Sequence, residues 1–224
     1  MSEQHFPLTD FIEYPQQQML QRATQNLQEL KRRHSIRKFS SRPVPQAIIE
    51  QCILTAGSAP SGANHQPWHF VAISDLQVKS QIRCEAEALE QAFYDGRAGE
   101  EWLDALKPLG TNADKAYLQQ APWLIAVFSQ KRGGVGESDD KTNYYVHESV
   151  GLACGFLIQA LHHAGLATLT HTPKPMSFLT RICNRNADNE RPFMLIVAGY
   201  PADDATIPAH ALKKKQLEQI CSFV

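Results

Sequence analysis

Several kinds of feature are missing from this 224-residue chain, and each absence narrows what the protein can be. No apolar run approaches the ~18 residues that a bilayer-spanning helix needs, so we expect no membrane insertion. The formal net charge is −1, which gives no reason to expect a nucleic-acid partner. The first five residues show neither a basic start nor an apolar stretch, so we do not expect secretion.

Patterned cysteines and nucleotide-binding glycines are missing as well. The five cysteines are scattered, with no C-x-x-C pair, so a disulfide framework and a zinc site are both disfavoured. Reduced, buried thiols in a cytoplasmic protein fit this usage best. The histidines lack metal-ligand spacing. No G-x-G-x-x-G follows the first predicted strand, and G-x-x-x-x-G-K-[ST] and G-x-S-x-G do not occur, which argues against dinucleotide-binding, P-loop and α/β-hydrolase folds.

What remains is a single domain of helices interspersed with a few short strands. Apolar periodicity predicts helices at 17–33, 45–57, 76–96 and 143–164, and strands at 68–74, 123–128, 166–170 and 193–198. The stretch 97–120 is polar and interrupted by Gly99, Pro108 and Gly110, so we expect a semi-ordered excursion there rather than core. The tail after Pro201 has little core character but carries spaced apolar residues. We therefore expect it to pack against another surface, for which a dimer partner is one candidate.

Two motifs carry most of the functional information. Arg33 and Arg37 lie four apart and can present two guanidinium groups to one anion, with Ser35 adding a hydroxyl. The stretch from Pro60 to Asn64 is too rich in turn-forming residues to be a helix interior, and it leads into a strand. Surface charge and a plain turn would explain either motif alone. Together they suit an anion clamp and a loop whose backbone lies against a planar ligand.

These two motifs resemble the FMN-binding signature of the nitroreductase superfamily. The resemblance implies an α+β nitroreductase fold, with a small mixed or antiparallel sheet wrapped by helices in a domain-swapped homodimer. Each of two FMN molecules would then be touched by both chains. The cofactor contacts that it implies are Arg33, His34, Ser35, Arg37, Pro60, Ser61, Gly62, Thr170, His171, Thr172 and Lys214. The Thr172 hydroxyl would lie at flavin N5, where a donor favours one-electron steps over hydride transfer. His171 stands where the animal enzymes have a small hydroxyl residue.

A third set of residues narrows the resemblance to the iodotyrosine deiodinase branch. Glu90 and Tyr94 share one helix face, and Lys115 follows after the interrupted stretch. An ordinary solvated helix would also produce such a pair. In the deiodinases a Glu, a Tyr and a Lys at this spacing belong to a lid, here 95–116, that grips an amino-acid zwitterion. Glu90 would then pair with the substrate ammonium and Lys115 with its carboxylate, while Tyr94 bonds the same end. The backbone N–H of Ala63 would bind the phenolate.

The sequence therefore predicts an FMN-dependent oxidoreductase that reductively dehalogenates a halogenated tyrosine by stepwise electron transfer. The resemblance implies that Thr172 and Ala63 are its catalytic residues. Electrons would come from NAD(P)H or from a reductase or flavodoxin-type partner. The chain would form one FMN-binding domain over 1–224, with an N-terminal arm at 1–16 and a tail at 201–224 docking on the dimer. Three alternatives stay open: an NAD(P)H-dependent nitro- or quinone reductase, an oxygen-dependent flavin-fragmenting enzyme, and a non-catalytic flavin-binding protein.

Overall fold

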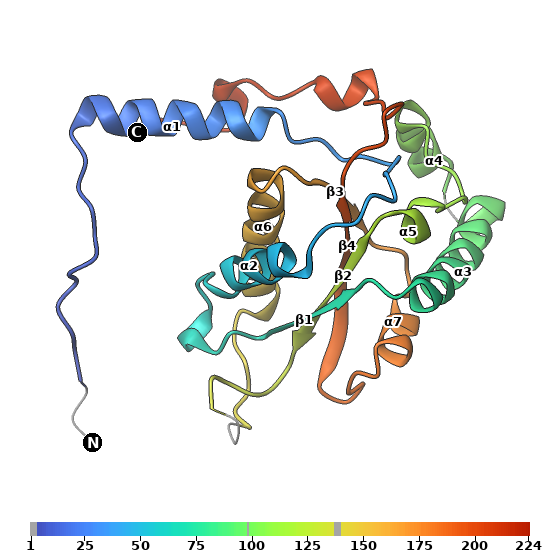
Figure 1. Ribbon diagram of the computed structural model, residues 1–224, viewed down its shortest axis with the longest axis horizontal. Helices are drawn as coiled ribbons and strands as arrows, with labels where there is room; N and C mark the ends of the chain where they lie inside the picture. The colour runs from blue at the N-terminus through green and yellow to red at the C-terminus, as the bar shows by residue number, and fades with distance from the viewer. Residues whose placement is uncertain (1–3, 98, 137–139) are drawn as a thin grey trace. The chain divides into compact units, whose positions relative to one another are not determined.

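The computed structural model describes residues 4–97, 99–136 and 140–224, and the chain divides into two units at Arg33 (Figure 1). The first unit contains one helix, α1 (Gln16–Lys31), in which no residue is buried. Its predicted apolar stripe includes Leu20 and Leu27, both of which are exposed. The guanidinium of Arg22 lies 4.4 Å from the centre of the Tyr14 ring, within the same unit. The helix predicted at 17–33 therefore forms, without a core of its own.

The second unit is built on one antiparallel sheet. Its strands are β1 (Trp68–Ile73), β2 (Trp123–Gln130), β3 (Ala167–His171) and β4 (Glu190–Gly199), in the order β1-β2-β4-β3. All three strand pairs are antiparallel. The four strands predicted from the sequence are therefore confirmed, although β2 and β4 extend beyond their apolar stretches into polar residues. Within the residues that the structure describes, no helix is both long and apolar enough to cross a membrane.

Helices cover both faces of this sheet (Figure 1). One face packs against α2 (Gln46–Gly57) and α6 (Val146–His163), and the other against α3 (Leu76–Ala92), α5 (Tyr117–Gln120) and α7 (Ser177–Ile182). Alternate side chains of β2 point to opposite faces, as the pleat requires: Phe128 joins the α3 side and Val127 the α6 side. Because both faces are covered, β2 is apolar and buried over most of its length.

The lid segment is more ordered than its composition predicts. The helix that precedes this segment, α3, is capped by Asp75, whose carboxylate accepts from the backbone N–H groups of Gln77 and Val78. After α3 come a π-helical turn, η2 (Phe93–Arg97), then α4 (Glu100–Leu106) and η3 (Lys107–Leu109). The prediction of a semi-ordered excursion over 97–120 is wrong at its end, because Tyr117 and Leu118 of α5 are buried in the core. Polar neighbours hid these two residues from the periodicity argument.

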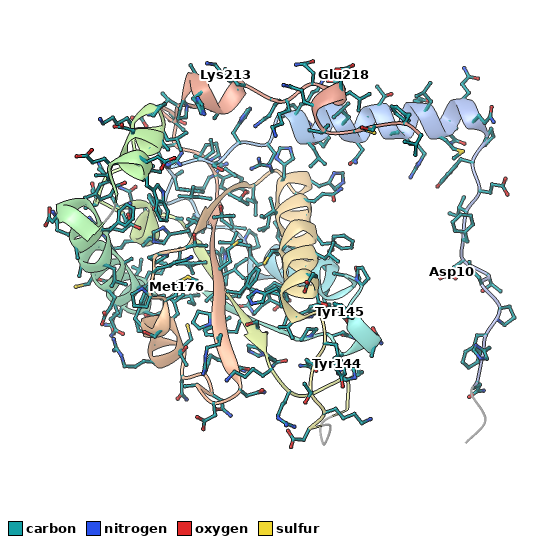
Figure 2. The ribbon with its side chains drawn as sticks, turned by 180° about the vertical axis from the view of Figure 1, so that it is seen from behind. Asp10, Tyr144, Tyr145, Met176, Lys213 and Glu218 are labelled. Atoms are coloured by element: carbon teal, nitrogen blue, oxygen red, sulfur yellow. The ribbon has the colours of Figure 1, made fainter. Side chains whose placement is uncertain are left out.

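Two other sequence predictions need correction. The helix predicted at 143–164 starts at Val146, because Tyr145 has a left-handed backbone with φ 51°. Figure 2 shows Tyr144 and Tyr145 side by side where the chain enters this helix. The thiols were predicted to be buried, yet Cys84 and Cys221 are exposed.

The tail has two short turns, η4 (Ala209–Leu212) and η5 (Leu217–Gln219), and neither contains a buried residue.

Candidate active site

A cavity of about 490 Å³ lies between the lid and the end of β3. Its apolar wall comes mainly from α3, η2 and α4, including Leu89, Phe93 and Trp102. The ring of Phe93 meets the Trp102 ring edge-to-face, with 5.2 Å between centroids, so η2 and α4 share a small aromatic cluster. Polar side chains are gathered in the same cavity: Arg37, Glu90, Tyr94, Thr111, Lys115, Tyr117, Thr170, His171, Thr172 and Lys174.

Arg37 reaches this cavity because the chain before it runs alongside β3. Ser35 forms a parallel bridge with Thr168, and the Ile36 N–H donates to the Thr168 carbonyl oxygen at 3.1 Å. Two residues further along the two segments come Arg37 and Thr170, and both line the cavity. The bridge therefore joins the predicted anion clamp to the predicted Thr170–Thr172 segment, which are far apart in the sequence.

Glu90, Tyr94 and Lys115 lie in one cavity, as the resemblance to the deiodinases implies. The Lys115 Nζ lies 3.0 Å from the Glu90 Oε2, with 6% and 19% of the two side chains exposed. Lys115 also donates to the Asn112 carbonyl oxygen. The Tyr94 hydroxyl donates to the Thr111 Oγ1 at 3.0 Å, which ties the π-helical turn to the end of the lid. A largely buried pair of opposite charges is a costly arrangement unless both members keep a partner.

A second layer of contacts positions Lys115. Its backbone N–H donates to the Glu87 Oε1 at 2.8 Å, and the Arg83 Nε donates to the same oxygen at 2.7 Å. Arg83 also reaches the Asp114 carboxylate at 3.2 Å. The hydrogen bond to Glu87 raises the pKa of Arg83. Sequence reasoning missed this group, although the i,i+4 spacing of Arg83 and Glu87 on a predicted helix was a usable signal.

Behind Lys115 lies a buried aromatic pair that the sequence analysis did not connect. The Tyr117 hydroxyl is 3.4 Å from the His171 Nδ1. Burial raises the pKa of Tyr117. Burial, and secondly the charge of Lys115, lower the pKa of His171 to about 3. Among the residues that the structure describes, nothing offers a hydrogen-bond partner to the His171 Nε2.

The loop from Pro60 to Asn64 lies elsewhere. Every residue of this loop is described, and none lines the cavity. Its short turn, η1 (Gly62–Asn64), leads into β1 on the opposite side of the unit from α4 (Figure 1). A methyl group added at Gly62 would come within 2.7 Å of the Tyr144 carbonyl oxygen, so packing against Tyr144 already requires glycine there.

The loop's backbone is unusual. Ala63 and Asn64 adopt positive φ angles of 50° and 55°. Left-handed backbone at a residue other than glycine costs free energy, of the order of 1 kcal/mol, and is concentrated at functional sites. The His65 ring bonds the Asn143 Oδ1 at 2.8 Å, and the Gln66 N–H donates to the Ser61 Oγ at 2.9 Å, which holds the loop in shape.

None of the remaining predicted cofactor residues of the second unit lines this cavity. Arg33 is the last residue of the first unit. His34 is partly exposed at the start of the second unit, and Lys214 is exposed between η4 and η5. Figure 2 shows the neighbouring Lys213 beside η4, within the tail. Their roles stay predictions. No group of three or more histidine, cysteine or acidic residues within 4–97, 99–136 and 140–224 could hold a metal ion.

Comparisons with known proteins agree with this architecture. The model of the nitroreductase family matches residues 30–200, so the chain belongs to the nitroreductase family. A nitroreductase with bound FMN from Bacteroides fragilis superposes with a TM-score of 0.62, covering 89% of this chain and 98% of the other, at 18% identity. That likeness shows the fold alone. The predicted α+β class is confirmed, with an antiparallel sheet.

Within the family, the chain belongs to the iodotyrosine deiodinase branch. It is 46% identical over 203 residues to an iodotyrosine deiodinase of Haliscomenobacter hydrossis, covering 91% of both chains. It is 40% identical over 217 residues to iodotyrosine deiodinase 1 of Homo sapiens, covering 97% of this chain and 74% of the human protein. A crystal structure of oxidised iodotyrosine deiodinase bound to FMN and 3-iodo-L-tyrosine matches with a TM-score of 0.69 and 32% identity, covering 80% of this chain and 90% of that one.

Proposed function

We propose that this protein uses FMN to remove the halogen from a halogenated tyrosine. One observation carries the proposal: Glu90 and Lys115, 3.0 Å apart, share a cavity with Tyr94 and with the end of β3. Two opposite charges on one wall match the two charged groups of a free amino acid. The structure that is 32% identical to this chain contains FMN and 3-iodo-L-tyrosine together, which supports the same pairing of cofactor and substrate here.

The residues present fit FMN. Arg37 offers a guanidinium, and Thr170 and Thr172 offer exposed hydroxyls along the same cavity wall. We propose that these three residues hold the cofactor, with Arg33, His34, Ser35, His171 and Lys214 as further contacts, and that Thr172 tunes its redox behaviour. When bound and reduced, FMN supplies the two electrons that, with one proton, convert a carbon–halogen bond into carbon–hydrogen and halide. NAD(P)H or a partner reductase or flavodoxin is the proposed electron source.

The protein's own residues bind and orient the substrate. Glu90 accepts hydrogen bonds from the substrate ammonium, Lys115 donates to its carboxylate, and Tyr94 bonds the same end. Because Glu90 and Lys115 already lie side by side, the entering zwitterion gives each charge a new opposite partner. Neither charge is left buried alone, so the exchange avoids a large desolvation penalty. Phe93 and Trp102 meanwhile exclude water from the bound ring.

The Pro60–Asn64 loop supports a homodimer. Pro60, Ser61 and Gly62 are proposed cofactor contacts, and the Ala63 N–H a donor to the substrate phenolate. None of these residues lines the cavity that Arg37 and Thr172 line. We therefore propose a domain-swapped homodimer in which each cofactor is contacted by both chains. Exposed apolar residues of the tail support docking on the dimer: Leu217, Ile220 and Phe223.

On this proposal, 1–224 functions as one FMN-binding domain, with 95–116 as the lid, 1–16 as an arm and 201–224 as the docking tail. The five cysteines are free thiols, which supports a reducing, cytoplasmic setting. Lys214 on the tail and the residues 33–35 would supply charge and hydroxyl groups to the cofactor phosphate.

Titration of the FMN-loaded protein with 3-iodotyrosine and with tyrosine, followed by flavin fluorescence, tests the substrate assignment. We expect strong quenching by 3-iodotyrosine, weak quenching by tyrosine, and iodide release from 3-iodotyrosine under anaerobic reduction. Glu90→Gln and Lys115→Ala should abolish the quenching. Lys107→Ala is the matched control, because Lys107 is an exposed lid lysine that pairs with Asp104 at the surface.

Quenching that survives Glu90→Gln and Lys115→Ala would contradict the zwitterion assignment. Reduction of nitroaromatics that is equally fast in wild type and in both variants, without iodide release, would instead support the nitroreductase alternative. Protein that does not retain FMN would contradict every flavin-dependent function.

A further inference from the structure

A buried histidine behind the lid has a polar atom that the rest of the described chain leaves unpaired. His171 is 7% exposed, lines the cavity, and its Nε2 has no hydrogen-bond partner in the part of the chain that the structure describes. Leaving such a group unsatisfied costs about 1–3 kcal/mol. A ligand that supplies the missing partner removes this penalty when it binds.

The alternation of β3 decides which way this side chain lies. Thr170 is exposed and His171 is buried, so the two point to opposite faces. His171 shares its face with Leu169, which belongs to the core under α3 and α5. The imidazole therefore lies with Tyr117 and Lys115, the residues at the lid's end, and apart from the exposed hydroxyls of Thr170 and Thr172.

The neighbours of His171 also decide which nitrogen carries the proton. Burial and the Lys115 ammonium keep the imidazole neutral, with a pKa of about 3, so it holds one proton. Burial raises the pKa of Tyr117, so its hydroxyl stays protonated. A phenol is a better donor than a neutral imidazole N–H, and an imidazole nitrogen is a better acceptor than a phenol oxygen. Tyr117 therefore donates to Nδ1, and the His171 proton resides on Nε2.

An unpaired N–H donor near a lysine ammonium calls for an anionic acceptor. Lys115 and His171 approach the same region from the lid and from β3, and the charge of Lys115 acts on the imidazole. We propose that His171, besides the cofactor contact proposed above, is a fifth substrate-binding residue, whose Nε2–H donates to the carboxylate that Lys115 binds. This inference rests on the proposed function and deepens it, since it makes the carboxylate end of the substrate a determinant of selectivity.

Two substitutions at His171 separate its two nitrogens. Gln places an amide nitrogen close to the position of Nε2, while Asn places one close to Nδ1 and nothing at Nε2. Each variant is loaded with FMN and titrated calorimetrically with 3-iodotyrosine and with 3-iodotyramine, which lacks the carboxylate. We expect His171→Asn to weaken 3-iodotyrosine binding about tenfold, and His171→Gln to stay within about threefold of wild type. The affinity for 3-iodotyramine should be the same in all three proteins.

The possible outcomes are distinct. If His171→Asn weakens both ligands equally, the residue has only a structural role and the inference is wrong. Unchanged 3-iodotyrosine binding in His171→Asn would overturn it as well. If the wild type binds neither ligand, the proposed function fails, and this inference with it. Nitrogen-15 spectra of the wild type provide a check without substrate, since a proton found on Nδ1 would contradict the assignment.

Discussion

The two faces of the sheet are packed with different chemistry. Under α2 and α6 the buried residues on the strands are apolar at the centre, such as Ile125, Val127 and Ile196. Under α3 and α5 the core also encloses charged or titratable groups, among them Lys115 and His171, and the Tyr117 hydroxyl lies 3.4 Å from the His171 Nδ1. Both faces come from the same four strands, and the polar groups of the α3 face come from the end of β3 (His171) and from the segment that enters α5 (Lys115 and Tyr117).

This difference teaches where function lies in the fold. In a buried apolar layer the side chains need only fit together in shape and volume, and their close packing stabilises the fold. A largely buried cation needs a partner, and Lys115 has the Glu90 carboxylate and the Asn112 carbonyl oxygen. On the proposed function, the α3 face is therefore the side on which substrate binding and stability are coupled. The four predictions below test that contrast, in order of decreasing effect.

Lys115→Met should cause the largest change. It removes the ammonium but keeps an apolar stem, leaving the Glu90 carboxylate largely buried without its cation. We expect a loss of unfolding free energy of about 3–5 kcal/mol, measured by urea denaturation. Adding Glu90→Gln to this variant should restore part of the loss, because both charges are then gone. Additive losses in the double variant would mean that the pair is not coupled.

Leu157→Ala makes the matching change on the α6 face. Leu157 is fully buried among apolar neighbours, so the substitution leaves a cavity and should cost about 3 kcal/mol of unfolding free energy. The affinity of the folded, FMN-loaded protein for 3-iodotyrosine should not change. A large fall in that affinity would break the contrast between the faces, because it would place the α6 face in the site.

The His171 imidazole should make stability depend on pH. Its pKa falls from an ordinary 6.5 to about 3 on folding. Below pH 6.5 the imidazole is therefore protonated in the unfolded chain but stays neutral in the folded chain. Stability is therefore complete above about pH 7 and is lost as pH decreases toward 3. Between pH 7 and pH 5 the loss amounts to about 2 kcal/mol.

His171→Gln removes this titration, so urea denaturation at the two pH values should show wild type losing about 2 kcal/mol more than the variant. The neighbouring Tyr117, whose pKa is raised by burial, does not change charge in this range. Equal pH dependence in the two proteins would show that the imidazole can be protonated without unfolding.

Much of the α3 face was predictable from sequence. The i,i+4 spacing of Glu90 and Tyr94 placed both on one helix face, and the resemblance to the deiodinases added Lys115 across a gap that no periodicity rule could bridge. The prediction that failed nearby, a semi-ordered excursion that includes residues 117–120, has a simple cause. Tyr117 and Leu118 stand among Lys, Gln and Asp residues, and a short helix of four residues leaves no periodic signal.

The tertiary contacts were beyond sequence reasoning. The bridge between Ser35 and Thr168 joins segments more than a hundred residues apart, and only the folded chain shows that Arg37 and Thr170 meet at one cavity. The unpaired nitrogen of His171 is likewise a property of packing, because its strand position predicts burial but says nothing about partners. The Pro60–Asn64 loop was recognised as a motif, while its separation from the cavity was not foreseen.

Lys214→Ala should have the smallest effect. Lys214 is exposed on the tail, where an ion pair with a phosphate is screened by water and salt. We expect the FMN dissociation constant to rise about threefold, measured by flavin fluorescence in low salt, and the difference to vanish at high ionic strength. Arg37→Ala is the comparison. Because Arg37 lines the cavity, its substitution should raise the FMN dissociation constant far more at either salt concentration. A loss of FMN in Lys214→Ala as large as in Arg37→Ala would show that the tail closes over the cofactor, because only exclusion of water makes one lysine that strong.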